Sequence, residues 1–292
     1  MRETGIRLPR RAESPEPPPS VDEQLERLGF GRFQWIALVA FVCFIVADGM
    51  ELVVTNIIWS VLPLEDWGAP DFYRATLVSA SFLGFVFGAL LGGFAGDVYG
   101  RLWLIYAHSV IFIPTSILSA LSQSIAMLLV TRFFVGFSIG LVLPAVVCMM
   151  SEICPASHRG RAVLAIPGIS YTVGQVTILL SGIYFISLYG FHCTDCEWWR
   201  WMLVAGVIPD AVGVCIVLAF VPESPRFLLY QGRLDRVQEV LQLIARTNDK
   251  ESNLKHDGAC RALPDDEEFC DVFKTAGEGQ PVQANCKTES KP

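Results

Sequence analysis

The sequence predicts an all-α membrane protein whose six transmembrane helices leave both chain termini on the cytoplasmic side. The 292 residues are 52% hydrophobic with a mean hydropathy of +0.45, above the apolar content of about 45–50% that is usual for soluble domains. The apolar residues are concentrated between Phe33 and Val221, in segments that reach the roughly 20 residues needed to cross a bilayer. The arginines are unevenly distributed between the loops that join these segments.

The six predicted spans cover residues 34–61, 76–95, 102–121, 125–150, 163–188 and 201–221. Arginines flank the ends that would share one side of the membrane: Arg27, Arg32, Arg101, Arg159, Arg161, Arg226, Arg233 and Arg236. The opposite loops are mainly acidic. The positive-inside rule therefore places both termini in the cytoplasm.

The chain divides into three regions. Residues 1–32 form a cytoplasmic segment, proline-rich at first, with a short surface helix that a capping box of Ser20 and Glu23 begins and Gly29 ends. Residues 33–222 form the membrane bundle. Residues 223–292 form a cytoplasmic helix and an acidic tail that we expect to be disordered.

Two carboxylates interrupt the first span. Asp48 and Glu51 lie three residues apart and therefore share one face of the helix. A carboxylate at this depth costs several kcal/mol unless it contacts water, a partner or a proton. We therefore predict a proton-binding or substrate-binding site on the inner face of the bundle; alternatively, Glu51 reaches the outer interface or forms a structural pair.

Other polar residues within the spans admit two interpretations each. Asp210, which follows Pro209, is either a further protonation site or a local departure that faces a cavity. Tyr171 and Gln175 share a face and could hydrogen-bond a substrate, although helix contacts use the same residue types. We expect His108 to be a packed, hydrogen-bonded histidine rather than a proton relay.

A glycine occurs at every fourth position of the second span, at Gly84, Gly88, Gly92 and Gly96. Such a row allows a neighbouring helix to approach closely, so we expect it to pack against another helix.

Several function classes are not supported by the sequence. No glycine-rich phosphate loop occurs, which argues against ATP-driven pumping, and the charge pattern does not favour nucleic-acid binding. The nine cysteines do not form a disulfide framework. Cys193 and Cys196 could form a strained disulfide, bind a metal with His192 or act in a thiol oxidoreductase, but we favour a loop without chemistry. We therefore expect no enzyme activity, no cofactor and no metal.

Four ordered motifs resemble those of the major facilitator superfamily. They are Gly96-Asp97-x-x-Gly100-Arg101, Arg132-x-x-x-Gly136-x-x-x-Gly140, Glu152-x-x-Pro155-x-x-x-Arg159-Gly160-Arg161 and Pro222-Glu223-Ser224-Pro225-Arg226. The first departs from the family pattern at Leu102, where a second basic residue is usual, and the proline-glycine motif of drug antiporters is not evident.

Within that superfamily, the chain resembles the synaptic-vesicle-two-related and niacin/organic-acid transporter branch. The matching segments are Gly29-Phe30-Gly31-Arg32-Phe33-Gln34-Trp35, Asp48-x-Met50-Glu51 and Trp199-Arg200-Trp201. The resemblance covers residues 21–226, the amino-terminal half of a family member. It implies one six-helix half of a twelve-span bundle, which holds its substrate between two halves at the midplane.

The resemblance also implies roles for charged residues. Arg132 is expected to face the central cavity and to take part in proton transfer or substrate binding, although it could instead extend to the membrane interface. An arginine near Asp48 would keep that acid ionised. A cytoplasmic cluster of alternating charge is expected to supply gating contacts, although the positive-inside rule alone would also explain its arginines. Its members are Asp97, Arg101, Glu152, Arg159 and Arg161, and the further expected gating residues are Gly96, Gly100, Glu223 and Arg226.

The favoured hypothesis is a secondary transporter, or its amino-terminal half, that moves a small organic solute by proton-linked alternating access. The solute is expected to be an organic ion, and the expected partners are the lipid bilayer and a second six-helix half. The alternative is a non-transporting six-span scaffold or assembly partner, in which the glycine row would seek a helix from another chain.

Overall fold

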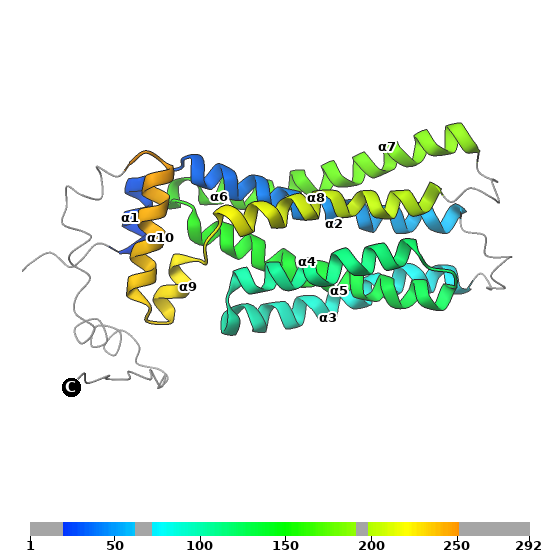
Figure 1. The fold of residues 1–292 in the computed structure, drawn as a ribbon, viewed down its shortest axis with the longest axis horizontal. Coiled ribbons are helices and arrows are strands. Elements are labelled where there is room, and N and C mark those ends of the chain that lie inside the picture. The colour runs from blue at the N-terminus through cyan, green and yellow to red at the C-terminus, as the bar shows by residue number, and fades with distance from the viewer. Residues whose placement is uncertain (1–19, 62–71, 191–197, 251–292) are drawn as a thin grey trace, which may run out of the picture. The chain divides into compact units, whose positions relative to one another are not determined.

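The computed structural model describes residues 20–61, 72–190 and 198–250. Within these ranges the chain is helical, with no strand (Figure 1). The expected disorder of the first residues and of the acidic tail concerns residues outside the described ranges, as does the Cys193 and Cys196 loop.

The helices run from α1 at the start of the described residues to α10 near their end. They are α1 (Val21–Leu28), α2 (Arg32–Val61), α3 (Phe72–Tyr99), α4 (Arg101–Ala120), α5 (Ile125–Ile153), α6 (Ala156–Ala165), η1 (Ile166–Ser170), α7 (Tyr171–Tyr189), α8 (Trp198–Phe220), α9 (Pro225–Tyr230) and α10 (Leu234–Thr247).

Six helical stretches in the described part of the chain are long and apolar enough to span a membrane, which confirms the predicted number. They cover Arg32–Ile58, Ala75–Tyr99, Arg101–Ala120, Ile125–Ile153, Ala156–Tyr189 and Trp198–Phe220. The fifth begins earlier than the sequence predicts, because α6, η1 and α7 follow one another without a break. The π-helical turn η1 contains Pro167, which lacks the N–H needed for a regular α-helical hydrogen bond.

Glycines from two helices bring α3 and α5 into backbone contact. A Cβ atom at Gly84 or Gly88 would overlap the carbonyl oxygens of Phe133 or Phe137 on α5. Reciprocally, a Cβ at Gly136 would overlap the backbone of α3. These glycines of the row therefore pack against a helix of the same chain. The scaffold alternative predicts that they contact a helix from another chain, and at these positions that prediction is wrong.

The last two glycines of the row differ from the first two. A Cβ at Gly92 would lie 3.1 Å from the Cα of Leu141 on α5, whereas one at Gly96 would meet the side chain of Leu104 on α4. The close α3–α5 contact thus loosens toward the end of α3.

A second close crossing joins α2 and α7. A Cβ at Gly49 would overlap the carbonyl oxygen of Tyr171, and one at Gly174 would overlap that of Val46. Because Gly49 directly follows Asp48, this crossing fixes the part of α2 that carries the predicted acidic site.

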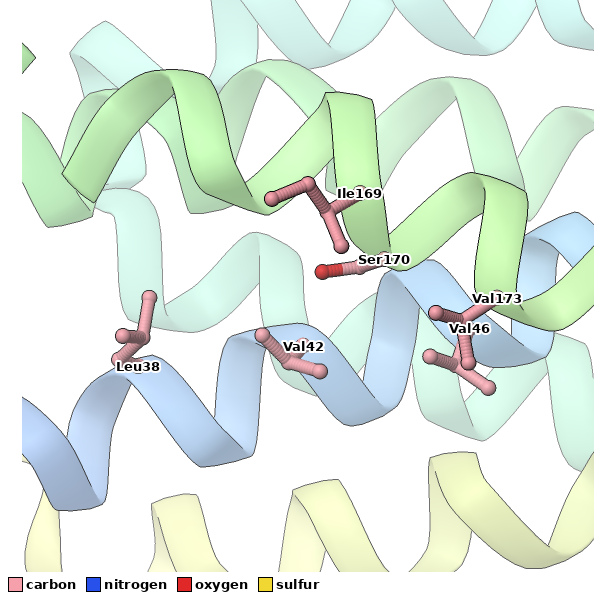
Figure 2. A pocket seen from close by; sticks show the side chains of 6 residues that line it. All are labelled: Leu38, Val42, Val46, Ile169, Ser170 and Val173. Atoms are coloured by element: carbon pink, nitrogen blue, oxygen red, sulfur yellow. The ribbon is translucent and has the colours of Figure 1, made fainter. Parts of the chain in front are cut away.

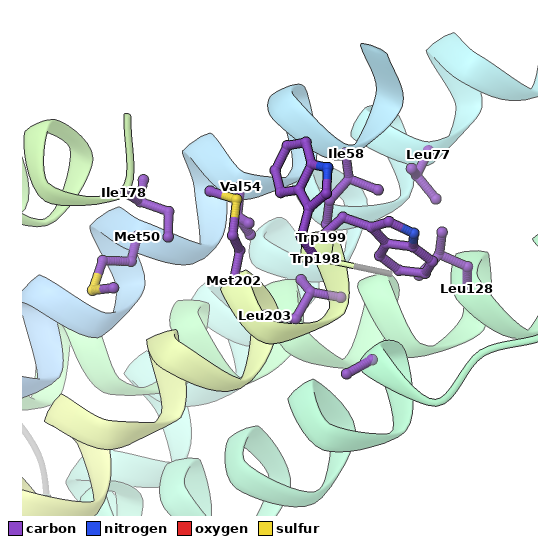
Figure 3. Packing of buried hydrophobic residues seen from close by; sticks show 11 residues of the cluster. Met50, Val54, Ile58, Leu77, Leu128, Ile178, Trp198, Trp199, Met202 and Leu203 are labelled. Atoms are coloured by element: carbon purple, nitrogen blue, oxygen red, sulfur yellow. The ribbon is translucent and has the colours of Figure 1, made fainter. Parts of the chain in front are cut away.

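An apolar cluster fills the bundle beyond the acidic site, toward the end of α2 (Figure 3). Trp198, Trp199 and Met202 of α8 pack there against Val54 and Ile58 of α2. In a membrane, side chains of this kind stabilise a helix bundle through van der Waals packing rather than through removal from water. Met50 belongs to the same cluster and places this packing directly beside Glu51 on α2.

The start of α2 is capped by a residue from the other end of the described chain. The side chain of Asn248, just after α10, accepts a hydrogen bond from the Phe33 N–H (2.9 Å) and donates one to Gln34 (3.0 Å). The short helix α1 occurs where the capping box predicts it and ends at Gly29, whose φ of +64° suits glycine. Helices α1, α9 and α10 lie together at this end of the bundle (Figure 1).

Candidate functional site

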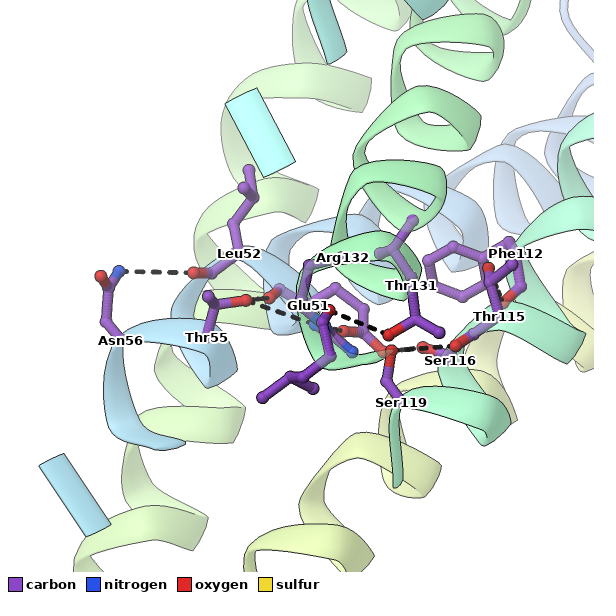
Figure 4. Close-up of polar contacts among 12 residues, drawn as sticks. Glu51, Leu52, Thr55, Asn56, Phe112, Thr115, Ser116, Ser119, Thr131 and Arg132 are labelled. Atoms are coloured by element: carbon purple, nitrogen blue, oxygen red, sulfur yellow. Dashed lines mark hydrogen bonds and ion pairs between the residues drawn. The ribbon is translucent and has the colours of Figure 1, made fainter. Parts of the chain in front are cut away.

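A buried ion pair lies at the centre of the predicted acidic site. The Nη1 atom of Arg132 on α5 lies 2.6 Å from Oε2 of Glu51 on α2, and both side chains are shielded from solvent. Ser116 of α4 donates a hydrogen bond to the other carboxylate oxygen, and the Thr55 hydroxyl lies 3.3 Å from Nη1 (Figure 4). Helices α2, α4 and α5 therefore converge on one carboxylate.

Helix α8 closes the fourth side of this carboxylate. A Cβ at Gly206 would lie 3.1 Å from the Oε1 atom of Glu51, which is tighter than ordinary contact. A glycine is therefore the residue that leaves room for the ion pair.

This geometry decides between several expectations for these residues. Arg132 is 1% exposed and points into the bundle, so the alternative prediction that it extends to the membrane interface is wrong. Glu51 does not reach the outer interface either, because it is equally buried. The acid paired with the arginine is Glu51 rather than Asp48, and the structure therefore corrects the expectation that Arg132 keeps Asp48 ionised.

Asp48 is in the opposite situation. It is 1% exposed, and neither carboxylate oxygen has a hydrogen-bond partner among the described residues. The charges that act on it most strongly belong to His108, Asp210 and Glu51. An isolated ionised carboxylate is very costly in such surroundings, and a bound proton removes that cost.

Asp210 and His108 form a second buried polar pair. The Nε2 atom of His108 on α4 lies 2.8 Å from Oδ1 of Asp210 on α8, and both side chains are fully buried. The other ring nitrogen lies 2.9 Å from the carbonyl oxygen of Ser138 on α5. The prediction of a packed, hydrogen-bonded histidine is confirmed, and Asp210 points into the bundle toward this ring.

Tyr171 and Gln175 lie on α7 at its crossing with α2. Both are partly buried, and Asp48 is close enough to Tyr171 to affect its hydroxyl electrostatically. Beside this crossing lies a small apolar cavity of about 200 Å³ (Figure 2). It is lined by Leu38, Val42, Val46, Ile169, Ser170 and Val173 and by none of the predicted substrate-binding residues.

The predicted gating residues form two groups rather than one. In the first, Arg101 lies 3.1 Å from Glu152 and 3.4 Å from Asp97, and it donates a hydrogen bond of 3.0 Å to the carbonyl oxygen of Gly96. This group joins the loop between α3 and α4 to the end of α5.

The same loop is also joined to the segment before α9. Gly100 has a φ of +102°, and a Cβ there would overlap the carboxylate of Glu223. The Glu223 carboxylate accepts a hydrogen bond from the Leu102 N–H at 3.2 Å. Burial raises the pKa of Glu223 above its ordinary value, and hydrogen bonds from the backbone of Ser224 and Leu102 oppose this shift only in part.

The second group centres on Asp22 of α1. Its carboxylate lies 3.0 Å from the Nη2 atom of Arg159 and is also paired with Arg226. Partial burial alone would raise the pKa of Asp22, but the hydrogen bonds and charges of the two arginines lower it below its ordinary value. Arg161 is exposed to solvent. The expected gating cluster places Arg159 together with Glu152. In the structure Arg159 instead pairs with Asp22 of α1.

Sequence reasoning missed several contacts of this site. Ser116 and Thr55 were not identified as partners of Glu51, and Asp22 was not identified as a partner of the arginines. The serine and threonine carry no distinguishing signal, since hydroxyl residues often bond their own helix. An acid in the first turn of α1 has an ordinary role at a helix amino terminus, which hides its long-range contact.

Comparison with known proteins places these features in context. The sequence model of a family described as "Sugar (and other) transporter" matches residues 64–258. The synaptic vesicle 2-related protein of Xenopus laevis is 30% identical over 228 residues, which are 78% of this chain and 39% of that protein. The 4-hydroxybenzoate transporter PcaK of Acinetobacter baylyi is 29% identical, over 73% of this chain and 45% of its own length.

A solved structure shares the fold. The major facilitator superfamily proton:xylose symporter XylE, bound to 6-bromo-6-deoxy-D-glucose, superposes with a TM-score of 0.65 at 19% sequence identity. The superposition covers 84% of this chain and 55% of the symporter. The chain thus spans about half or less of the length of the proteins that it matches.

Proposed function

Because the chain belongs to the sugar (and other) transporter family of the major facilitator superfamily, we propose that it forms a proton-linked secondary transporter or the amino-terminal half of one. In this proposal it moves a small organic solute by alternating access. The single observation that carries the proposal is Asp48, an acid buried in the bundle whose two oxygens lack partners among the described residues.

The two acids of α2 have different tasks in this mechanism. Asp48 binds and releases the driving proton, since protonation removes the cost of a buried charge that no described partner offsets. Glu51 holds Arg132 in the centre of the bundle through the 2.6 Å ion pair. The central cavity between the two six-helix halves then opens alternately to the two sides of the membrane, so that Asp48 exchanges its proton with each side in turn.

The proposed substrate is an organic ion, which Arg132 contacts. The Nε and Nη2 atoms of Arg132 are buried and lack hydrogen-bond partners in the described part of the chain. Such donors favour an acceptor that carries negative charge. The relative named for 4-hydroxybenzoate transport supports an organic anion. Tyr171 and Gln175, at the α2–α7 crossing, would supply further hydrogen bonds.

The charged groups at the end of the bundle are the proposed gate, on the cytoplasmic side that the positive-inside rule favours. The contacts of Arg101 with Glu152 and of Glu223 with the α4 amino terminus hold α3, α4, α5 and α9 together in this conformation. They would separate when the bundle rocks. A second six-helix half, from a longer chain or a second copy, would complete the cavity.

Uptake into proteoliposomes under a pH gradient tests the proposal. We expect Asp48→Asn to abolish accumulation driven by the gradient while exchange of substrate across the membrane persists. Accumulation that continues undiminished when Asp48→Asn is combined with Glu51→Gln would refute the assignment.

Crosslinking in the membrane would show whether a second copy supplies the other half, since a lone inert monomer would favour the scaffold alternative.

A further inference from the structure

The hydrogen bonds of His108 determine where its ring protons lie. Its Nδ1 atom is 2.9 Å from the carbonyl oxygen of Ser138, and since a carbonyl oxygen only accepts, Nδ1 carries a hydrogen. Its Nε2 atom is 2.8 Å from Oδ1 of Asp210, so one more proton must lie between these two atoms. Whether the ring or the acid holds that proton, the pair as a whole is electrically neutral.

Two aromatic rings keep the imidazole in this orientation. Phe112 stacks on it with ring centroids 5.0 Å apart, and Phe44 meets it edge-on at 5.8 Å. The ring therefore cannot readily exchange its nitrogens. Loss of the shared proton would leave a lone pair on Nε2 facing the buried Asp210 carboxylate, which is an uncompensated charge.

The surrounding charges show what this pair does for Asp48. Helix α2 contributes Asp48, Glu51 and the half-buried thiol of Cys43, which lies near Asp210. Helix α5 contributes Arg132, which neutralises Glu51, and α7 contributes Tyr171 near Asp48. With both pairs neutral, Asp48 is the acid of this cluster whose two carboxylate oxygens, within the described residues, have no hydrogen-bond partner.

We propose that His108 and Asp210 are positioning residues that permanently retain one proton between them and so keep Asp48 as the exchangeable acid of the buried cluster. The inference rests on the proposed proton-carrying function of Asp48. In this proposal His108 on α4 and Asp210 on α8 keep their shared proton and stay neutral as a pair. The buried cluster then exchanges one proton, that of Asp48, rather than two.

Nuclear magnetic resonance of the chain labelled with ¹⁵N-histidine, in detergent micelles or nanodiscs, tests the retained proton. The chain has four histidines, and His108→Gln identifies the signal of His108 by its loss. We expect that signal to stay constant between about pH 5 and 8, where an ordinary imidazole changes its charge. A His108 signal that titrates through this range would overturn the inference.

Infrared spectroscopy of the protonated carboxyl band tests the electrostatic balance without requiring transport. Asp48→Asn assigns the band. His108→Gln removes the partner of Asp210 and leaves a second buried carboxyl that competes with Asp48 for protons. Because two neighbouring carboxylates repel each other, the pH midpoint of the Asp48 band should rise by about one to three units. The double variant His108→Gln with Asp210→Asn is neutral again, and its midpoint should return close to that of the unmodified chain.

The outcomes separate this inference from the function on which it rests. If the Asp48 band titrates but its midpoint is the same with His108→Gln, the balance is refuted while the proton site stands. If the double variant keeps the midpoint of the single variant, the pair acts through packing alone and the inference is also refuted. If the unmodified chain shows no titrating Asp48 band, the proposed function fails and the inference fails with it.

Discussion

Two carboxylates on one helix, three residues apart, lie in opposite surroundings. Glu51 contacts the Arg132 guanidinium at 2.6 Å and accepts a hydrogen bond from Ser116. Asp48 is equally buried but has no hydrogen-bond partner in the described part of the chain. The difference indicates a division of labour: one acid holds helices together, and the other is available to a proton. The following variants test each side of this contrast.

The largest expected effect comes from breaking the ion pair. Arg132→Met would leave the Glu51 carboxylate buried without its opposite charge, and loss of one partner of a buried pair typically costs about 3–5 kcal/mol. Denaturant unfolding in detergent measures the change in the free energy of unfolding. The double variant Arg132→Met with Glu51→Gln is the control and should recover much of the loss, because neither position of the pair then carries a charge. Equal losses in the single and double variants would show that the pair does not stabilise the bundle electrostatically.

A smaller loss is expected at the α3–α5 contact, which holds α5 and hence Arg132 in place. A Cβ at Gly88 would overlap the carbonyl oxygen of Phe137, so Gly88→Ala should destabilise by about 1–3 kcal/mol through overpacking. Gly93 lies on the same helix with nothing within 4 Å of its Cβ position, and Gly93→Ala should be neutral or stabilise by up to about 1 kcal/mol. If the unfolding curves of Gly88→Ala and Gly93→Ala coincide, the close contact between α3 and α5 at Gly88 is contradicted.

The smallest effect concerns Asp22, which tests whether exposed charges behave differently from buried ones. Its pKa is lowered in the folded chain, so its contribution to stability is full above the ordinary pKa and is lost as pH falls through the folded value. Asp22→Asn should therefore loosen α1 at neutral pH by less than about 1 kcal/mol and have no effect in acid. Hydrogen exchange of the α1 amides measures this change, with Glu239→Gln on α10 as the control. Protection of α1 that is the same in both variants at neutral pH would contradict the role of Asp22.

Much of the architecture could be predicted from local sequence properties. Hydropathy alone identifies the six spans, and the ordered motifs around Gly96, Arg132 and Glu152 identify the superfamily, which the family match confirms. The shared inner face of Asp48 and Glu51 follows from helical spacing. These features depend on residues close together in the chain.

The pairing of the charged residues could not be predicted in the same way. Asp48 and Glu51 face similar directions, so the choice of Glu51 as the partner of Arg132 depends on how α2 and α5 pack. His108 and Asp210 are 102 residues apart, and each was recognised as polar in an apolar span without the other being known as its partner. Such contacts are set by tertiary structure, for which spacing within one helix carries no signal.

Residue-resolved labelling with a hydrophobic carbodiimide tests the central contrast most directly, because this reagent forms adducts with protonated carboxyl groups in the membrane. Peptide mass spectrometry after labelling the chain in liposomes distinguishes the two acids of α2. The account predicts an adduct on Asp48 that declines as pH rises and is absent in Asp48→Asn, with Glu51 unmodified in its ion pair. Labelling of Glu51 with Asp48 unmodified would contradict it.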